Sequence, residues 1–188
     1  MNGADWGPQS SAYEIRRVVD QAGSTNDAEI AELDEPALLQ TTARHIADGK
    51  IVGWFQGAAE WGPRALGQRS LLALPGSVVT RERLNRVIKQ REPFRPFAPA
   101  VLSERAAEFF SDAPNYLTPF MTSVCDVLPR HLQALAGVTH ADGTARVQTV
   151  SATEQSLLFR VLSGLERQTG LPVVLNTSLN GPGEPIVA

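Results

Sequence analysis

Basic side chains are concentrated in one part of this 188-residue sequence. Between Arg64 and Arg95 there are eight basic and two acidic residues, a net charge of +6, whereas the whole chain carries −3. The basic residues of this window are Arg64, Arg69, Arg81, Arg83, Arg86, Lys89, Arg91 and Arg95. A local positive excess in an acidic chain indicates a bound anion, because a nucleic-acid-binding domain is normally basic as a whole.

Polar side chains also gather at four places where apolar runs end or loops begin. The four clusters are Glu60 with Arg64 and Arg69; Lys89, Arg91 and Arg95; His140, Asp142, Arg146 and Gln148; and Asn176, Ser178 and Asn180. Arginine binds phosphate or carboxylate through paired hydrogen bonds, while hydroxyl, amide and glycine N–H groups orient the anion. If the clusters converge, they can position a polyphosphate and stabilise the charge that develops in phosphoryl or adenylyl transfer.

Other features have simpler interpretations. The chain has no Walker-type phosphate loop, and the glycines at 57–62 and 181–183 are weak signals on their own. His140 and Asp142 lack a third ligand nearby, so we expect a turn hydrogen bond and no metal site there. A solvated helix face accounts for Arg81, Arg83 and Arg86.

The apolar pattern predicts the elements that must position these side chains. Helices are expected over about 12–22, 35–48, 80–88, 104–110 and 154–168, and strands over 51–55, 71–74, 100–102, 146–150 and 172–175. The expected N-caps are Ser11, Asp34 and Thr80, and the first helix should end at Gly23 and pack its apolar face on the core.

The segments between these elements give weaker signals. Residues 91–99 should run extended because of their prolines, with Arg95 between two aromatic anchors. Residues 142–143 should form a turn, 111–136 have no clear pattern, and 184–188 look like the start of another strand. We expect one α/β (α+β) domain over 1–188, with a twisted, mostly β central sheet flanked by helices.

Composition excludes several other classes of protein. The single cysteine, Cys125, cannot form an internal disulfide, and 43% hydrophobic residues are enough for a core. No apolar stretch reaches the length of a membrane span, and the first residues lack a signal-peptide pattern. The expectation is a cytoplasmic protein with no membrane partner.

Five long motifs occur in order along the chain. They are GWFQG (53–57), EWGPRALGQRS (60–70), RPFAP (95–99), THADGTARVQTV (139–150) and NTSLNGPGEPIV (176–187). Together they resemble the C-terminal domain of the NodU/TobZ/CmcH-type O-carbamoyltransferases. This resemblance implies a YrdC-like domain that binds ATP, with or without Mg²⁺, and carbamoyl phosphate, and that makes carbamoyl-adenylate.

The same resemblance implies a partner for this chain. An N-terminal domain of the actin-like ATPase type, which holds the metal, would pass the carbamoyl group to a hydroxyl of the acceptor. The chain is therefore expected to be a fragment or stand-alone piece of a two-domain enzyme.

The resemblance also implies roles for single residues. The lysine-x-arginine element of YrdC-type domains corresponds to Lys89–Arg91, and the serine-x-asparagine element to Ser178–Asn180. The implied catalytic residues are Lys89, Arg146 and Ser178. The implied nucleotide and carbamoyl ligands are Arg64, Arg69, Arg91, Arg95, Asn176 and Asn180. The sequence departs from the family pattern at Leu74, Gly76, Leu179, Gly181 and Pro182.

Two other functions are compatible with these residues. One is a non-catalytic module that keeps an ATP-sized anion pocket for binding or regulation. The other is binding of structured RNA, but the acidic composition and the lack of interleaved exposed aromatics argue against it.

Overall fold

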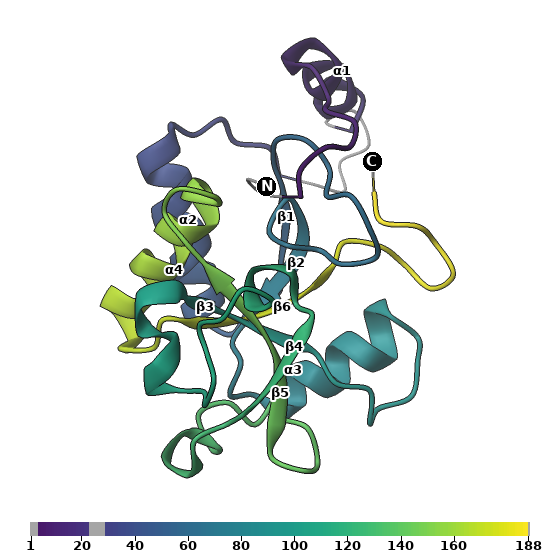
Figure 1. Ribbon diagram of the computed structural model, residues 1–188. Helices are drawn as coiled ribbons and strands as arrows, with labels where there is room; N and C mark the ends of the chain where they lie inside the picture. The colour runs from purple at the N-terminus through teal and green to yellow at the C-terminus, as the bar shows by residue number, and fades with distance from the viewer. Residues whose placement is uncertain (1–3, 23–28, 188) are drawn as a thin grey trace.

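The computed structural model describes residues 4–22 and 29–187, and its centre is a six-stranded sheet (Figure 1). The strand order is β1-β2-β6-β3-β5-β4. The strands are β1 (Val52–Phe55), β2 (Arg69–Ala73), β3 (Ala98–Leu102), β4 (Ser123–Asp126), β5 (Thr144–Val150) and β6 (Val173–Ser178). Neighbouring strands pair antiparallel except β3 and β5, which are parallel. The open, mixed sheet confirms the predicted α/β class.

Helical elements flank this sheet. The α-helices are α1 (Ala12–Ala22), α2 (Glu35–Ala47), α3 (Val78–Arg83) and α4 (Ser156–Thr169). A π-helical turn, η2 (Leu84–Ile88), continues α3 directly. Short 3₁₀ turns are η3 (Ser103–Glu108), η4 (Thr118–Phe120) and η5 (Pro129–His131). None of the helices within 4–22 and 29–187 combines the length and the apolar character that a membrane crossing requires.

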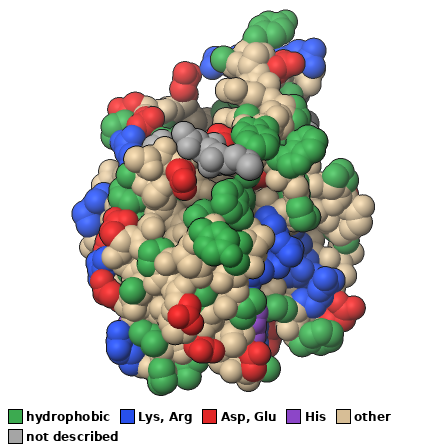
Figure 2. Space-filling model, in the orientation of Figure 1, with side chains coloured by type: hydrophobic (Ala, Val, Ile, Leu, Met, Phe, Trp, Pro, Cys, Tyr) green, Lys and Arg blue, Asp and Glu red, His purple; other side chains and the backbone are tan. Residues whose placement is uncertain are grey.

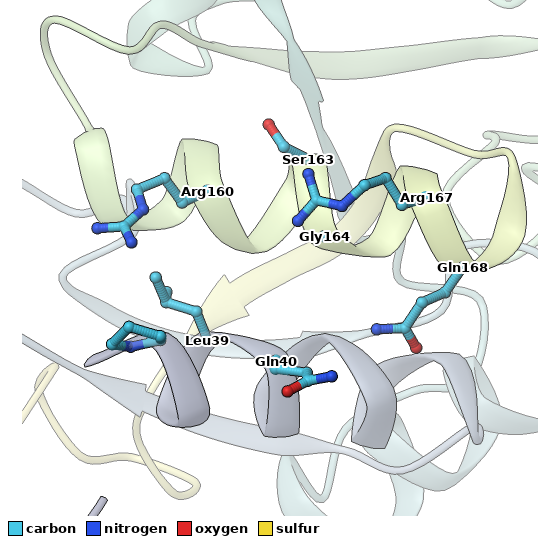
Figure 3. A pocket seen from close by; sticks show the side chains of 8 residues that line it. Leu39, Gln40, Arg160, Ser163, Gly164, Arg167 and Gln168 are labelled. Carbon is cyan, nitrogen blue, oxygen red and sulfur yellow. The ribbon is translucent and has the colours of Figure 1, made fainter. Parts of the chain in front are cut away.

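Helices α2 and α4 pack side by side on one face of the sheet (Figure 1). Leu158, Leu162 and Leu165 of α4 are fully buried, as its helical spacing predicts, and they meet Leu72 and Val174 of the sheet. A shallow groove of about 430 Å³ remains between the two helices (Figure 3).

The opposite face of the sheet buries a second apolar cluster. Leu71, Val101 and Val173 alternate with the residues that face α4, because successive strand side chains point to opposite faces. They pack against side chains from η2 and from the long connection after β3, including Leu84 and Phe110. The sheet is therefore covered on both faces.

The predicted helix starts are mostly confirmed. Asp34 Oδ1 accepts a hydrogen bond from Ala37 N at 2.9 Å, and Ser11 and Glu14 form the expected capping box. The third helix begins earlier than predicted, since Ser77 rather than Thr80 is its N-cap. The hydroxyl of Ser77 reaches the N–H three residues on, which is the ordinary capping geometry.

Several other expectations about the elements are wrong. The apolar face of α1 does not pack on the core, because no residue of α1 is buried. The apolar run at 51–55 suggests a buried strand, but Phe55 of β1 keeps 39% of its surface exposed. The helix predicted over 104–110 is the 3₁₀ turn η3, and β4 lies in the segment that had no clear pattern.

Two further differences concern chain ends. Residues 184–187 form no strand, and Val187 N instead bonds Leu179 O at 3.1 Å, which closes a loop after β6. The predicted end of the first helix at Gly23 lies outside the described residues.

Candidate anion-binding site

Most of the predicted site residues line two adjoining recesses beside the end of β6. The smaller, of about 220 Å³, is lined by Arg64, Arg146 and Asn176 among others. The larger, of about 450 Å³, is lined by residues that include Lys89, Arg95 and Asn180. Arg91 and Ser178 line both. We call the two recesses together the cationic site. A concentration of Lys and Arg side chains is visible on this side of the molecule (Figure 2).

The sheet register explains why these residues meet. Ala98 of β3 pairs with Asn176 of β6, and Ala100 pairs with Gln148 of β5, so Arg146 lies level with Ala98. Along β5 and β6, every second residue faces the same side as α4. These stripes are apolar beneath α4, at Val150 and Val174, and become polar towards the other end of the strands.

The loop between β1 and β2 carries Arg64 and is held by one carboxylate. Glu60 Oε1 accepts backbone hydrogen bonds from Leu66, Gln68 and Arg69 at 2.7, 2.6 and 3.2 Å. Gly67 has φ +112°, a conformation that disfavours side chains, and a Cβ there would lie 2.6 Å from Leu158. Glu60 and the glycine thus shape the loop and do not face the ligand space.

A buried amide network fixes the same loop from below. Gln148 Nε2 donates to Leu66 O at 2.7 Å, and Asn176 Nδ2 donates to Gln148 Oε1 at 2.8 Å and to Ala65 O at 3.1 Å. Asn176 Oδ1 is buried and has no hydrogen-bond partner among the described residues. An acceptor left in this state favours a ligand that donates a hydrogen bond.

Arg69 does not reach the cationic site. Its side chain is fully buried, donates to Gln56 O at 2.6 Å and Gly57 O at 3.1 Å, and lies 3.6 Å over the ring of Phe55. The structure therefore places Arg69 among the residues that hold the loop, although its sequence position suggested a phosphate ligand.

Lys89 is the most enclosed cation of the site, with 8% of its surface exposed. Its Nζ donates to Ser178 O at 2.6 Å and to Asn180 Oδ1 at 2.7 Å, and it lies 3.3 Å from Ser178 Oγ. Burial, and after it the positive charge of Arg91, lower the pKa of Lys89 to about 8. The two elements singled out by the resemblance are thus in direct contact.

Three guanidinium groups meet without a matching number of carboxylates. Burial lowers the pKa of Arg146, and the nearby charges of Arg64 and Arg91 lower it too. The pKa of Arg91 is lowered by burial and by Arg95, and only Glu92 opposes this effect. Like charges repel at short range, and an anion placed between them would relieve this repulsion.

The segment 91–97 shows one departure from expectation. Phe97 is buried and Arg91 lies 4.7 Å over its ring, but Phe94 keeps 81% of its surface exposed. Arg95 therefore has one aromatic anchor nearby rather than two. Its guanidinium is 3.9 Å from the carboxylate of Glu92 and remains largely exposed.

The third polar cluster of the sequence does not stay together, since His140 lines a different recess from Arg146. Asp142 Oδ1 accepts from Thr144 N at 3.0 Å and from Thr144 Oγ1 at 2.7 Å, which confirms the predicted turn. Within 4–22 and 29–187, no three His, Cys, Asp or Glu side chains are grouped to hold a metal ion.

The solvated helix face predicted for three arginines is confirmed in part. Arg83 and Arg86 are exposed, but Arg81 is half-buried and donates to Ala136 O at 3.4 Å.

Another recess, of about 500 Å³, borders the cationic site. It is mostly apolar, its walls include Phe94, Leu132 and His140, and it shares Pro96 with the smaller cationic recess. Burial lowers the pKa of His140, so its ring favours the neutral form. Sequence patterns gave no sign of this recess, because its walls come from segments about 40 residues apart.

Comparison with known proteins agrees with this set of motifs. A family model described as carbamoyltransferase C-terminus matches residues 43–188. The chain belongs to this carbamoyltransferase family. All residues of the cationic site lie inside the matched range, whereas α1 and the first residues of α2 precede it.

Relatives in the family are much longer than this chain. Nodulation protein NolNO of Sinorhizobium fredii is 46% identical over 161 residues, which cover 85% of this chain and 23% of the relative. Nodulation protein NolO of Bradyrhizobium diazoefficiens is 41% identical over 97% of this chain and 33% of its own length. The 3'-hydroxymethylcephem-O-carbamoyltransferase of Amycolatopsis lactamdurans is 45% identical over 76% of this chain and 26% of its own length. The chain thus spans about a quarter to a third of these relatives.

Proposed function

We propose that this chain is the carbamoyl-adenylate-forming part of an O-carbamoyltransferase. It binds ATP and carbamoyl phosphate in the cationic site, and the carbamoyl group then passes to a hydroxyl of an acceptor. The observation that carries this proposal is the convergence of Arg64, Arg91 and Arg146 on one recess, where the charges of the first two lower the pKa of the third. The family to which the chain belongs supports the same reaction class.

The reaction consumes one water, one carbamoyl phosphate and one ATP. Water attacks the phosphorus of carbamoyl phosphate, the bond from phosphorus to the carbamoyl oxygen breaks, and carbamate leaves as phosphate forms. A carbamate oxygen then attacks the α-phosphorus of ATP, and the bond to the bridging oxygen breaks so that pyrophosphate leaves. Negative charge grows on the phosphoryl oxygens during this step, and fixed cations lower its barrier.

The residues of the site suit these roles. Lys89 and Arg146 are half-buried or buried cations, so their charge acts with little screening by solvent. Arg64, Arg91 and Arg95 would bind the phosphates, and Ser178 and Asn180 would orient them from the end of β6. Asn176 Oδ1 is an acceptor in need of a donor, and the carbamoyl NH₂ group supplies one. The nearby apolar recess is suited to the base of the nucleotide.

Transfer to the acceptor needs groups beyond those of the cationic site, and the relatives contain further chain outside the part that this sequence matches. We propose a separate N-terminal domain of the actin-like ATPase type for this role. The small share of each relative that the chain covers supports a further domain.

Exchange of labelled pyrophosphate into ATP tests the adenylation step without an acceptor. We expect carbamoyl-phosphate-dependent exchange by the 188-residue chain. Lys89→Ala and Arg146→Ala should each lower its rate about 10²–10³-fold, the usual cost of removing a preorganised electrostatic group. Arg83→Ala is the matched control, because Arg83 is an exposed arginine outside both recesses, and it should retain the wild-type rate.

Calorimetry separates the proposed enzyme from a binding module. ATP should bind more tightly than inorganic tripolyphosphate, and both affinities should weaken as salt rises. A folded chain that binds ATP but shows no exchange, alone or with the rest of a longer relative added, would support the non-catalytic module. A chain that binds neither ligand at low salt would refute the site.

A further inference from the structure

Asn85 is a fully buried polar residue that lines neither recess. It lies in the π-helical turn η2, between α3 and the segment that carries the cations of the larger recess. Buried amides are retained only where their hydrogen bonds are satisfied, so its partners indicate its role.

Both ends of the Asn85 amide hold the segment that carries the arginines. Its Oδ1 accepts from Arg91 Nε at 2.7 Å. Its Nδ2 donates to Pro93 O at 3.2 Å and to Arg95 O at 3.0 Å. The backbone contributes as well, because Arg91 N donates to Asn85 O at 3.0 Å. Asn85 thus restrains the guanidinium of Arg91 and the backbone of Arg95.

The π-helical turn explains how Asn85 reaches this segment. Lys89 N donates to Leu84 O at 2.8 Å, an i→i+5 bond that widens the last turn before the chain leaves the helix. Wide turns of this kind are frequent at functional sites. The widened turn contains the buried Asn85 and places Lys89, the next residue after it, against the end of β6.

The hydrogen bond from Arg91 Nε also fixes which atoms of the guanidinium remain for a ligand. The plane is held at Nε by Asn85, lies 4.7 Å over the Phe97 ring, and directs Nη2 towards Pro96 O at 3.5 Å. Nη1 has no partner among these contacts. Repulsion from Arg95 and Arg146 would move an unrestrained Arg91 towards solvent, where water screens the charges.

We propose that Asn85 is a positioning residue that holds Arg91 in the cationic site before the anion arrives. It acts through Arg91 and does not touch the ligand. Preorganisation of this kind raises affinity because the cost of ordering the side chain is met on folding rather than on binding. The inference rests on the proposed anion site, but not on the adenylation chemistry.

A double-mutant cycle with inorganic tripolyphosphate tests this role. Calorimetry would compare the wild-type chain with Asn85→Leu, Arg91→Ala and the double variant. We expect each single substitution to weaken binding about tenfold, the effect of losing one charge-assisted contact. In the Arg91→Ala background, Asn85→Leu should weaken binding clearly less than in the wild type, because only the backbone contacts to Pro93 and Arg95 then remain to be lost. Thr80→Val, a buried polar residue outside both recesses, is the control and should bind as the wild type does.

The outcomes separate this inference from the proposed function. Losses that multiply in the double variant would mean that Asn85 acts independently of Arg91, and would overturn the role. Tripolyphosphate binding with no pyrophosphate exchange would refute only the adenylation step. Binding of neither tripolyphosphate nor ATP by the wild type at low salt would refute both proposals.

A second measurement does not depend on whether the variant folds. The Nε–H of Arg91 in the wild-type chain should exchange slowly with solvent in nitrogen-15 NMR spectra, because it is hydrogen-bonded to a buried oxygen. Exchange as fast as that of the exposed Arg83 would overturn the proposal. If Asn85→Leu is too unstable, Asn85→Ser enters the same cycle, with melting temperatures recorded for every variant.

Discussion

Lys89 combines three properties that seldom occur together at one lysine. It is buried, it contacts the backbone and side chains of Ser178 and Asn180, and it lies beside another cation. Burial and like charge both favour the neutral amine, which has one donor fewer and cannot attract a phosphate. The charge of this residue is therefore sensitive to pH in a range where other lysines stay protonated.

We predict that ATP affinity falls as pH rises through about 8, the pKa of Lys89. Below this pH the ammonium group is present and attracts the phosphates, and above it the amine is neutral. Calorimetry between pH 7.5 and 9.5 would follow the change. Lys89→Arg should bind with an affinity that stays flat over this range, because a guanidinium keeps its charge. Parallel pH profiles for the two proteins would contradict the assignment.

The pH dependence of stability should have the opposite sign. The pKa of Lys89 is lower in the folded chain than its usual value, so the unfolded chain holds the proton more tightly. The contribution of Lys89 to the free energy of unfolding therefore rises between about pH 8 and the usual lysine range. Binding and stability thus respond in opposite directions to the same proton.

At the scale of the elements, helices α2 and α4 approach each other closely at one point. A Cβ built on Gly164 of α4 lies 3.2 Å from the Cβ of Ala43 on α2, closer than ordinary packing. Gly164 also lines the groove between the helices, next to Ser163 and Arg167 (Figure 3). No residue of this groove lines the cationic site. The contact therefore serves packing of the helix layer.

We predict that Gly164→Val separates the two helices and destabilises the chain by about 1–3 kcal/mol, the usual cost of overpacking. ATP affinity should stay within about twofold of the wild type at temperatures where the variant is folded, since the groove is remote from the site. Thermal unfolding and calorimetry give the two readouts. Ser163→Ala, the neighbouring position, should change the melting temperature little. An unchanged melting temperature for Gly164→Val would show that the helices have room to adjust.

At the scale of the whole molecule, one sheet is shared by two apolar clusters. Trp54 belongs to the cluster beneath α2 and α4, and Cys125 belongs to the cluster on the opposite face. Both are buried, with 5% and 3% of their surfaces exposed. Since the same strands form a wall of each cluster, neither face keeps its packing when the sheet is lost.

We predict that both faces unfold in one transition, as expected for a single domain of this size. In a Trp6→Phe, Trp61→Phe variant, urea unfolding would be followed by Trp54 fluorescence and by the reactivity of the Cys125 thiol. Trp6 and Trp61 are 60% and 73% exposed, so their replacement should change stability little. The two midpoints should coincide, and midpoints that differ by more than their errors would divide the chain into two units.

Local sequence patterns were enough to predict the charged residues of the candidate site and most of the sheet. Residue type fixes charge, and the apolar runs at 71–74, 100–102 and 172–175 mark strands buried on both faces, so these strands could be predicted locally. The ordered motifs were long enough to indicate the carbamoyltransferase family, which the family model confirms. Short strands such as β4, and a helix such as α1 with no buried residue, depend on contacts that local patterns do not contain.

Which polar residues line the candidate site and which hold the loops became visible in the three-dimensional structure alone. Arg64 and Arg69 lie in one motif, yet one lines a recess and the other is buried against backbone carbonyls. Asn85 carries no motif, and its role follows from a hydrogen bond to Arg91 that depends on a widened helical turn. The physical reason is that a side chain's charge is a property of the residue, whereas its burial and partners are set by segments distant in sequence.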